Sequence, residues 1–165
     1  MEFARFTVRR ASAEDAALLA DLGARTFRDT FAAQNSESDM AAYLANAFGD
    51  DIQARELAET SSAFFIALTE GGAAGYARLR RGPAPACVSA RRPAEIVRFY
   101  ADAPWIGHGV GGALMKACFG EAVSYDSDVV WLDVWERNLR AIAFYAKWGF
   151  KIDSPEEVVW MRKRQ

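Results

Sequence analysis

The chain has 165 residues, a length that fits one compact domain and leaves little room for a second. Hydrophobic residues make up 52% of it and charged residues 25%, which is typical of a folded globular protein and excludes global disorder. The formal net charge of −2 argues against non-specific binding to nucleic acid. No apolar run is long enough to span a bilayer and the N-terminus lacks a secretion signal, so we expect a cytoplasmic protein without membrane association.

The two cysteines and the single histidine narrow the chemistry. Cys87 and Cys118 are far apart and form no Cys-x-x-Cys pair, which favours two free thiols in a reducing compartment. With one histidine, the chain lacks the ligands of a structural zinc site, so we expect no metal.

The first half of the chain predicts a strand and then helices. Ser12 stands three residues before Asp15, as an N-cap does in a capping box, and apolar residues at helical spacing follow. The elements expected here are a strand over 3–10, a helix from Ser12 to about Phe31, a second helix beginning at Ser36 or Ser38, and a short helical piece over 52–57.

From residue 63 onward the pattern changes to strands. The apolar run 63–68 ends at Gly71-Gly72, a hairpin signal, and residues 75–80 alternate as a half-buried strand does. The remaining elements expected are a strand over 95–101, a helix from Val110, a strand over 129–135, a helix over 138–148 ended by Gly149, and a strand over 158–161. The order β-αα-βββ-α-β-α-β predicts one central sheet with helices packed on it.

Six arginines crowd the middle of the chain. They indicate either a solvated strand face and loop or an anion-binding surface, and the first interpretation is favoured. The six are Arg78, Arg80, Arg81, Arg91, Arg92 and Arg98.

A glycine-rich segment, Gly107-His108-Gly109-Val110-Gly111-Gly112, lies between a predicted strand and a predicted helix. Glycines let successive backbone N–H groups turn toward one point, and the start of the helix adds unpaired N–H groups and its positive dipole end. These features predict an anion cradle suited to a pyrophosphate. A glycine turn without a ligand is the alternative.

The same letters also match Gly-x-Gly-x-x-Gly, the fingerprint of dinucleotide-binding domains. That motif follows its strand directly and opens a βαβ unit. Here residues 102–106 intervene, and the motif comes too late in the chain to leave room for a second nucleotide-binding half. The sequence therefore disfavours an NAD- or FAD-binding domain.

The helix after residue 135 carries a second candidate site. Asn138, Ala141, Ile142 and Tyr145 are spaced so that they share one helix face. Taken singly, Asn138 is explained as a helix cap and Tyr145 as a core aromatic. Their spacing, one βα unit after the glycine segment, favours a functional role.

These two blocks resemble the signature motifs of the GNAT-type N-acetyltransferases. Residues 106–114 resemble the first motif, and residues 134–138 with 141–150 resemble the second. The resemblance extends over 1–165 as a single acetyltransferase domain. It implies an α+β (mixed α/β) fold with a single central, mostly antiparallel sheet of six to seven strands flanked by about four helices. A weaker likeness of residues 24–31 to the polyamine- and small-amine-acetylating branch implies a small-molecule, polyamine-like amine as acceptor.

The resemblance also implies acetyl-CoA as cofactor and gives roles to particular residues. Phe99 and Ala101 would pair with the pantetheine arm, and a backbone N–H near Tyr100 would stabilise the oxyanion. Tyr145 would protonate the departing thiolate, since a phenol keeps its proton at neutral pH and is close to a thiol in acidity. The cofactor-binding set is Phe99, Tyr100, Ala101, Gly107, His108, Gly109, Val110, Gly111, Gly112, Asn138 and Tyr145.

One position departs from the family pattern: Ile106 stands where the loop motif usually has Arg or Gln. A side chain that helps to order the loop is therefore missing. We expect weaker cofactor affinity rather than none, because backbone donors form most of the cradle.

The general base has several candidates. Glu95, at the start of the cofactor strand, is the first, acting through water, although a structural strand-end carboxylate is as good an explanation. His108 has a suitable unperturbed pKa but sits in the glycine segment, where a solvated loop histidine is favoured. Asp133 is expected to be buried in mid-strand, with either a structural role or a substrate contact.

The acceptor side is expected to be lined by the first two helices. Phe27, Thr30, Phe31 and Tyr43 are the candidates, because aromatic rings hold an alkylammonium by cation–π contact. Plain core packing explains Phe27 and Phe31 equally well.

Three other functions compete with a small-amine acetyltransferase. A non-catalytic acyl-CoA-binding regulatory module is favoured only by Ile106. Acetylation of a protein N-terminus or lysine lacks a peptide-holding insertion to support it. A nucleic-acid protein rests on the arginine cluster alone. A homodimer is implied only at the level of the family.

Overall fold

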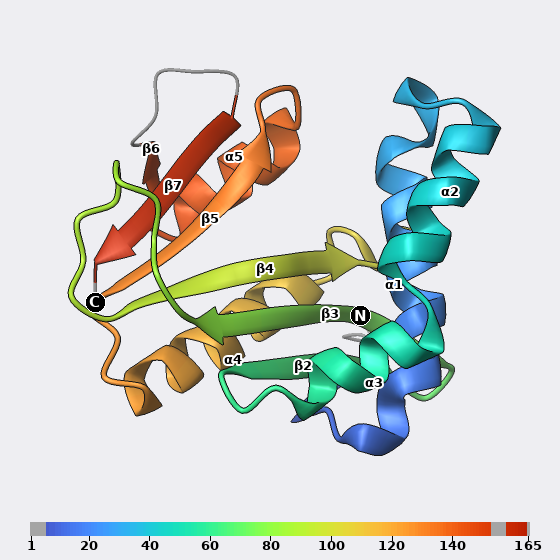
Figure 1. Ribbon diagram of the computed structural model, residues 1–165, viewed down its shortest axis with the longest axis horizontal. Helices are drawn as coiled ribbons and strands as arrows, with labels where there is room; N and C mark the ends of the chain where they lie inside the picture. Colours follow the sequence, from blue (N-terminus) through green and yellow to red (C-terminus); the bar gives the residue numbers. More distant parts are fainter. Residues whose placement is uncertain (1–5, 153–157, 165) are drawn as a thin grey trace. The chain divides into compact units, whose positions relative to one another are not determined.

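The computed structural model describes residues 6–152 and 158–164 (Figure 1). Among these residues, seven strands form one sheet in the order β1-β2-β3-β4-β5-β7-β6. They are β1 (Thr7–Arg10), β2 (Ser62–Thr69), β3 (Gly72–Arg81), β4 (Pro93–Ala101), β5 (Val129–Trp135), β6 (Lys151–Ile152) and β7 (Val158–Arg164).

Most strand pairs are antiparallel, as the sequence predicted. The pairs β1–β2, β5–β7 and β6–β7 run antiparallel, whereas β4 and β5 run parallel. The α-helices are α1 (Ala16–Phe31), α2 (Glu37–Ala47), α3 (Asp50–Ala58), α4 (Val110–Ser124) and α5 (Leu139–Lys147). The predicted mixed fold is thus confirmed. It differs from the expectation in one added short strand, β6, and in longer α3, β3, β4 and β7. Residues 3–5 of the strand expected over 3–10 lie outside the described residues.

The chain divides into two compact units, each made of two separate stretches. Unit 1 comprises Met1–Arg78 and Arg98–Cys118, and unit 2 comprises Leu79–Val97 and Phe119–Gln165. Strands β3 and β4 contribute residues to both units. That the whole chain, 1–165, forms a single domain therefore stays a prediction.

The predicted capping box lies in unit 1, at the 3₁₀ turn Ala13–Asp15 that precedes α1. The backbone N–H of Ser12 donates to Asp15 Oδ2 at 2.8 Å, and the box opens a short 3₁₀ turn that leads into the helix. The Arg9 guanidinium also donates two hydrogen bonds of 2.8 Å to Asp15, and these bonds lower the pKa of the Asp15 carboxyl to about 2. Ser36, rather than Ser38, caps α2, because its Oγ accepts from the backbone N–H of Asp39.

Strand β3 differs from the sequence prediction in its burial pattern and in the surroundings of Arg78. The predicted alternation is wrong, because residues 74–79 are all buried. Arg78 lies among them at 3% exposure, held by ion pairs to Glu56 and to Glu59, the latter at 2.7 Å. Glu56 also binds Arg98 at 2.8 Å, so one glutamate joins the two arginines. Arg78 is therefore not a solvated strand residue, and Arg98 is only 16% exposed at its side chain.

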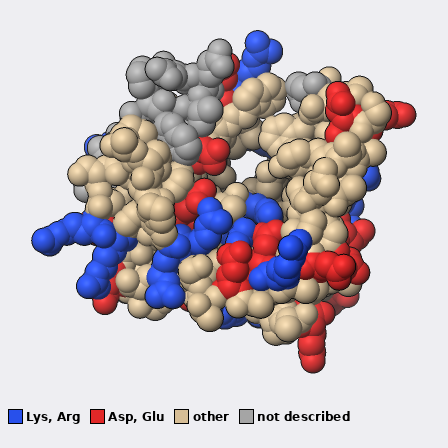
Figure 2. All heavy atoms as spheres, viewed as in Figure 1, with Lys and Arg blue, Asp and Glu red and all other residues tan. Residues whose placement is uncertain are grey.

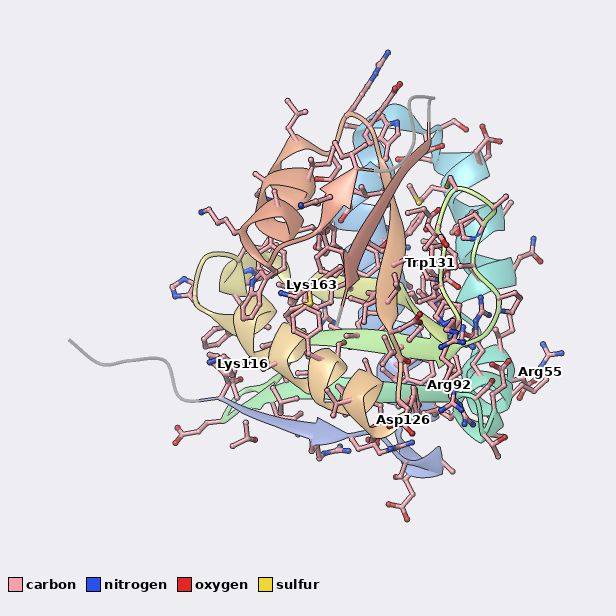
Figure 3. All side chains as sticks on the ribbon, turned by 90° about the vertical axis from the view of Figure 1, so that its left-hand side faces the viewer. Arg55, Arg92, Lys116, Asp126, Trp131 and Lys163 are labelled. Carbon is pink, nitrogen blue, oxygen red and sulfur yellow. The ribbon has the colours of Figure 1, made fainter. Side chains whose placement is uncertain are left out.

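Three of the other four arginines of the cluster have side-chain neighbours in unit 2. Arg80 pairs with Glu95, Arg81 lies over the Tyr125 ring, and Arg92 pairs with Asp126 at 3.5 Å (Figure 3). Figure 2 shows positive and negative side chains interspersed on the face that it presents. Four of the six arginines, Arg78, Arg80, Arg92 and Arg98, thus form intramolecular ion pairs, and Arg91 and Arg92 are exposed as a solvated loop predicts.

Unit 2 is built around β5. Val129 and Trp131 of this strand pack against Val88 of the loop between β3 and β4. Asp133, expected to be buried, is exposed, so that prediction was wrong. Neither cysteine forms a disulfide, and Cys87 is exposed whereas Cys118 is buried. Within the described part of the chain, no helix is both long enough and apolar enough to cross a membrane.

Candidate active site

The glycine segment lies in unit 1, between the end of β4 and the start of α4. After Ala101 the chain passes through a short 3₁₀ turn, Ala103–Trp105, and the N–H of His108 donates to the Trp105 carbonyl at 3.2 Å. Gly107 and Gly109 then adopt φ values of +85° and +89°. Such values are strained for residues with a side chain, so the path of this loop depends on glycine.

Steric crowding does not explain why these two positions are glycine. A Cβ at Gly107 would meet nothing within 4 Å, and one at Gly109 would lie 3.7 Å from the Phe6 ring, an ordinary contact. Glycine is therefore required by the backbone conformation, which points successive amides in directions that an ordinary residue resists. The loop is built to present its backbone.

Helix α4 begins at Val110, as predicted, and its first turn leaves amides available. The N–H of Ala113 bonds to the Gly109 carbonyl at 3.2 Å, whereas the amides of residues 109–112 have no backbone acceptor among the described residues. Unpaired N–H groups and the positive end of the helix dipole attract anions. The loop and helix start thus have the features of an anion-binding site, and their binding of a pyrophosphate stays a prediction.

A third glycine, Gly75 on β3, allows the two ends of this connection to come close together. A Cβ at Gly75 would lie 2.6 Å from the Tyr100 carbonyl oxygen and 2.9 Å from Val110 Cγ1. The end of β4 and the first residue of α4 therefore both pack against the backbone of β3. The sequence marked Gly75 only as the start of a strand and gave no signal of this crowding.

The end of β4, predicted to bind pantetheine, lies beyond the stretch that pairs with β5. Strands β4 and β5 are paired from Pro93–Glu95 to Val129–Trp131, in parallel register. Phe99, Tyr100 and Ala101 lie beyond that paired stretch and are partly buried. Their roles toward the cofactor stay predictions.

Helix α5, in unit 2, begins at the predicted cap. Asn138 Oδ1 accepts a hydrogen bond of 3.3 Å from the N–H of Ala141, so its side-chain carbonyl is used by the helix. This contact accounts for Asn138 structurally and leaves its predicted contact with the cofactor untested.

Tyr145 sits near the other end of α5 in a Schellman motif. Gly149, at φ +92°, donates its N–H to the Ala146 carbonyl, and Phe150 donates its N–H to the Tyr145 carbonyl at 3.1 Å. The Phe150 and Tyr145 rings meet edge to face at 5.7 Å, which is the hydrophobic contact that accompanies this motif. Tyr145 is 7% exposed, so its ring is held firmly by the helix end.

A lysine from β7 forms a hydrogen bond with the same helix end. Lys163 Nζ donates to the Trp148 carbonyl at 2.7 Å and lies 5.0 Å from the centre of the Phe119 ring (Figure 3). A positive charge at a helix C-terminus is favourable, because the last carbonyls are unpaired and the dipole is negative there. Nothing in the local sequence indicated this contact.

The candidate bases differ in surroundings. Glu95 is largely buried and its Oε2 accepts a hydrogen bond of 2.8 Å from Arg80. His108 is exposed, with its ring against the edge of Trp105 at 5.8 Å. Asp133 is an exposed carboxylate on a strand whose other residues are apolar.

Three of the four acceptor candidates come together in unit 1. The Phe27 ring stacks on Tyr43 at 4.4 Å and tilts against Phe31 at 4.6 Å, and Tyr43 is 50% exposed. Thr30 differs, because its hydroxyl donates to the Thr26 carbonyl one turn earlier in α1. The cluster joins α1 to α2, and only Tyr43 offers a large exposed surface.

The predicted site residues thus fall into two sets. Unit 1 holds the donor strand end, the glycine segment and the aromatic cluster, whereas unit 2 holds Glu95, Asn138 and Tyr145.

Comparison with known proteins defines the class. The model of the acetyltransferase (GNAT) family matches residues 24–150. An uncharacterized N-acetyltransferase in the pepI 3′ region of Lactobacillus delbrueckii subsp. lactis is 33% identical over 124 residues, covering 75% of this chain and 72% of that protein. An uncharacterized N-acetyltransferase of Mycobacterium bovis is 32% identical over 139 residues, covering 84% and 85%.

Solved structures agree on the fold. A PaiA N-acetyltransferase from Thermoplasma acidophilum, in complex with coenzyme A, superposes with a TM-score of 0.83 at 20% identity, covering 98% of this chain and 99% of that one. A GCN5-related N-acetyltransferase from Rhodopseudomonas palustris gives a TM-score of 0.74 at 20% identity, covering 100% and 99%.

The family match and the N-acetyltransferase relatives therefore identify an acyltransferase that uses acetyl-CoA. The chain belongs to the acetyltransferase (GNAT) family, and it is an N-acetyltransferase, as the two sequence motifs predicted.

Proposed function

We propose that this enzyme transfers the acetyl group of acetyl-CoA directly to the primary amine of a small, polyamine-like molecule within a ternary complex. The glycine segment carries the proposal, because its positive-φ glycines and the free amides of the α4 start make a backbone cradle for a diphosphate. Binding both reactants in line supplies much of the acceleration through proximity.

On the donor side, the amides of Gly107 to Gly112 bind the pyrophosphate and the backbone of Phe99 to Ala101 pairs with pantetheine. The positive φ of Gly107 and Gly109 supports the first role. The position of residues 99–101 beyond the β5-paired stretch supports the second. A backbone N–H near Tyr100 stabilises the oxyanion, and Asn138 contacts the cofactor with the part of its amide that the helix cap leaves free.

Proton transfer is assigned to Tyr145 and Glu95. Tyr145 gives its phenol proton to the departing sulfur, and its firm placement by the Schellman motif suits a general acid, since little reorganisation is then needed. Glu95 takes the proton of the attacking amine through water. Its Oε2 is held by Arg80, which leaves Oε1 as the proton acceptor.

On the acceptor side, the exposed ring of Tyr43 attracts an alkylammonium by cation–π contact. Phe27 stacks on that ring, and Phe31 packs against Phe27. Thr30 lies on the same helix, α1, where its hydroxyl is bonded to the Thr26 carbonyl, and it lines the acceptor side with them. A cytoplasmic location belongs to the proposal, in keeping with two cysteines that form no disulfide, and so do a homodimer and a single domain over 1–165.

Calorimetric titration with acetyl-CoA, followed by measurement of thiol release with a panel of amines, tests the proposal. We expect micromolar-range binding and turnover that is fastest with amines bearing a second cationic group. Turnover with peptides but not with small amines would mean that the acceptor is a protein N-terminus or lysine and not a small amine. Binding without turnover on any amine would favour an acyl-CoA-binding regulatory module, for which Ile106 is the one supporting residue.

A further inference from the structure

We propose that the ion pair between Arg25 and Asp102 is a positioning device for the donor-binding loop, and that it supplies the order which the side chain at position 106 does not. This inference rests on the proposed binding of acetyl-CoA at residues 107–112. Arg25 and Asp102 are positioning residues, since neither is assigned a contact with the donor.

Two hydrogen bonds hold the Arg25–Asp102 ion pair in one orientation. Arg25 Nε donates to Asp102 Oδ1 at 3.1 Å and Arg25 Nη2 donates to Asp102 Oδ2 at 3.0 Å, so both carboxylate oxygens are engaged by one guanidinium. A two-point contact of this kind fixes direction as well as distance. The Asp102 side chain is only 14% exposed, which shields the pair in part from solvent.

Asp102 stands where the loop leaves the sheet. It follows the last residue of β4 directly, its N–H donates to the Ala74 carbonyl at 2.8 Å, and its own carbonyl accepts from the Trp105 N–H at 2.8 Å. The Trp105 carbonyl in turn accepts from His108, inside the glycine segment. A chain of hydrogen bonds therefore runs from Arg25 through Asp102 to the loop.

Arg25 is itself fixed from the helix side. Its Nη1 donates to Asp21 Oδ2 at 2.7 Å, one turn earlier on α1. The guanidinium thus spans from α1 to the first residue after β4. Because Asp21 is 76% exposed, that second contact is screened by water and is the weaker one.

The side chain of Ile106 explains why the loop needs this ion pair. It is 38% exposed, and an aliphatic side chain donates no hydrogen bond to the loop. Flexible glycines at 107 and 109 raise the entropy that is lost when the loop binds a ligand. A fixed stem lowers that loss without adding a contact to the ligand.

The test is calorimetric titration of coenzyme A with wild type, Asp102→Asn and Arg25→Lys, alongside steady-state kinetics with the best amine. Asp102→Asn keeps the side-chain shape but removes the charge. We expect it to raise the Kd for coenzyme A about ten-fold, while kcat at saturating acetyl-CoA changes less than about two-fold. Arg25→Lys, which keeps the charge but loses the two-point contact, gives an intermediate Kd.

Asp15→Asn is the matched control. Asp15 accepts two hydrogen bonds of 2.8 Å from Arg9 in the same unit, and its side chain is 9% exposed, so it is the same kind of pair at another place. It should lower stability without changing the Kd for coenzyme A. Asp21→Asn, which removes only the outer contact of Arg25, should leave the Kd within about two-fold.

The outcomes separate the inference from the proposed function. Wild type that fails to bind coenzyme A overturns the proposed function itself. Wild-type binding with an unchanged Kd in Asp102→Asn overturns the positioning role alone. Equal increases in Kd for Asp102→Asn and Asp15→Asn also overturn it, because the effect would then be general loss of stability. If Asp102→Asn does not fold, an Arg25→Lys enzyme with wild-type Kd and unfolding midpoint overturns it equally.

Discussion

The glycine segment and helix α5 are predicted to serve the same reaction, but they are built in opposite ways. The segment depends on backbone conformation, with Gly107 and Gly109 at positive φ and few side-chain contacts. Helix α5 adds side-chain contacts to its backbone Schellman motif, because the Tyr145 ring packs against Phe150 and Lys163 binds the helix end. Binding by backbone tolerates a changed side chain such as Ile106, whereas a function that rests on one phenol does not.

Removing the Tyr145 hydroxyl is the strongest test of this difference. In Tyr145→Phe we expect kcat to fall by about 100-fold or more, because the general acid is lost, while the Kd for coenzyme A stays near that of wild type. Stopped-flow or steady-state thiol release measures the first, and calorimetry the second.

Tyr125→Phe is the matched control for Tyr145→Phe, since it removes a phenol from the same unit under the Arg81 side chain. It should leave kcat unchanged. A Tyr145→Phe enzyme with wild-type kcat would transfer the role of acid to another group.

Straining the loop backbone should affect binding instead. In Gly109→Ala the new methyl group meets only the Phe6 ring at 3.7 Å, so the cost comes from the φ of +89°. A strain of roughly 1–2 kcal/mol predicts a Kd for coenzyme A about ten-fold higher, with kcat at saturation preserved. Gly71→Ala, in the β2–β3 turn and free of positive φ, should bind as wild type does. Unchanged binding in Gly109→Ala would show that the cradle does not need this conformation.

Releasing the end of α5 should act through stability. Lys163→Met keeps the apolar stem but removes the hydrogen bond to the Trp148 carbonyl, so the free energy of unfolding should fall by about 1–2 kcal/mol. Urea titration followed by tryptophan fluorescence measures this change. Lys116→Met, at an exposed position on α4 (Figure 3), should have no measurable effect. Equal stability of the two variants would mean that Lys163 does not hold the helix.

Restoring a basic side chain before the loop should have the smallest effect. Ile106→Arg adds a charge at an exposed position to a cradle that the backbone already forms, so the Kd for coenzyme A should fall by less than about five-fold. Calorimetry at low and moderate salt checks this. A decrease of 100-fold would mean that the backbone cradle is much weaker than the geometry indicates.

Local patterns in the sequence predicted the elements that carry the site. The cap at Ser12, the start of α4 at Val110 and the end of α5 at Gly149 appear where the sequence placed them, and Ser36 is one of the two serines offered as the cap of α2. Each of these is decided within a few residues by capping or by glycine conformation. The fold class followed from their order.

Contacts between distant residues were not predictable in this way. Arg78 reads as a solvated strand residue because its partners, Glu56 and Glu59, lie far away in the sequence on and after α3. The apolar neighbours of Asp133 suggested burial, but they do not reveal that this face of β5 is open at that point. Lys163 and Gly75 gain their roles only from what the fold brings next to them.

The contact between Arg25 and Asp102 also sets an order of events during folding. These residues are 77 positions apart, so the contact closes a long chain loop and cannot form early at low entropic cost. On the ribosome, α1 is complete long before Asp102 emerges. We therefore expect substitutions at Arg25 to accelerate unfolding while leaving the refolding rate nearly unchanged, so that the donor-binding loop is among the last parts of unit 1 to become ordered.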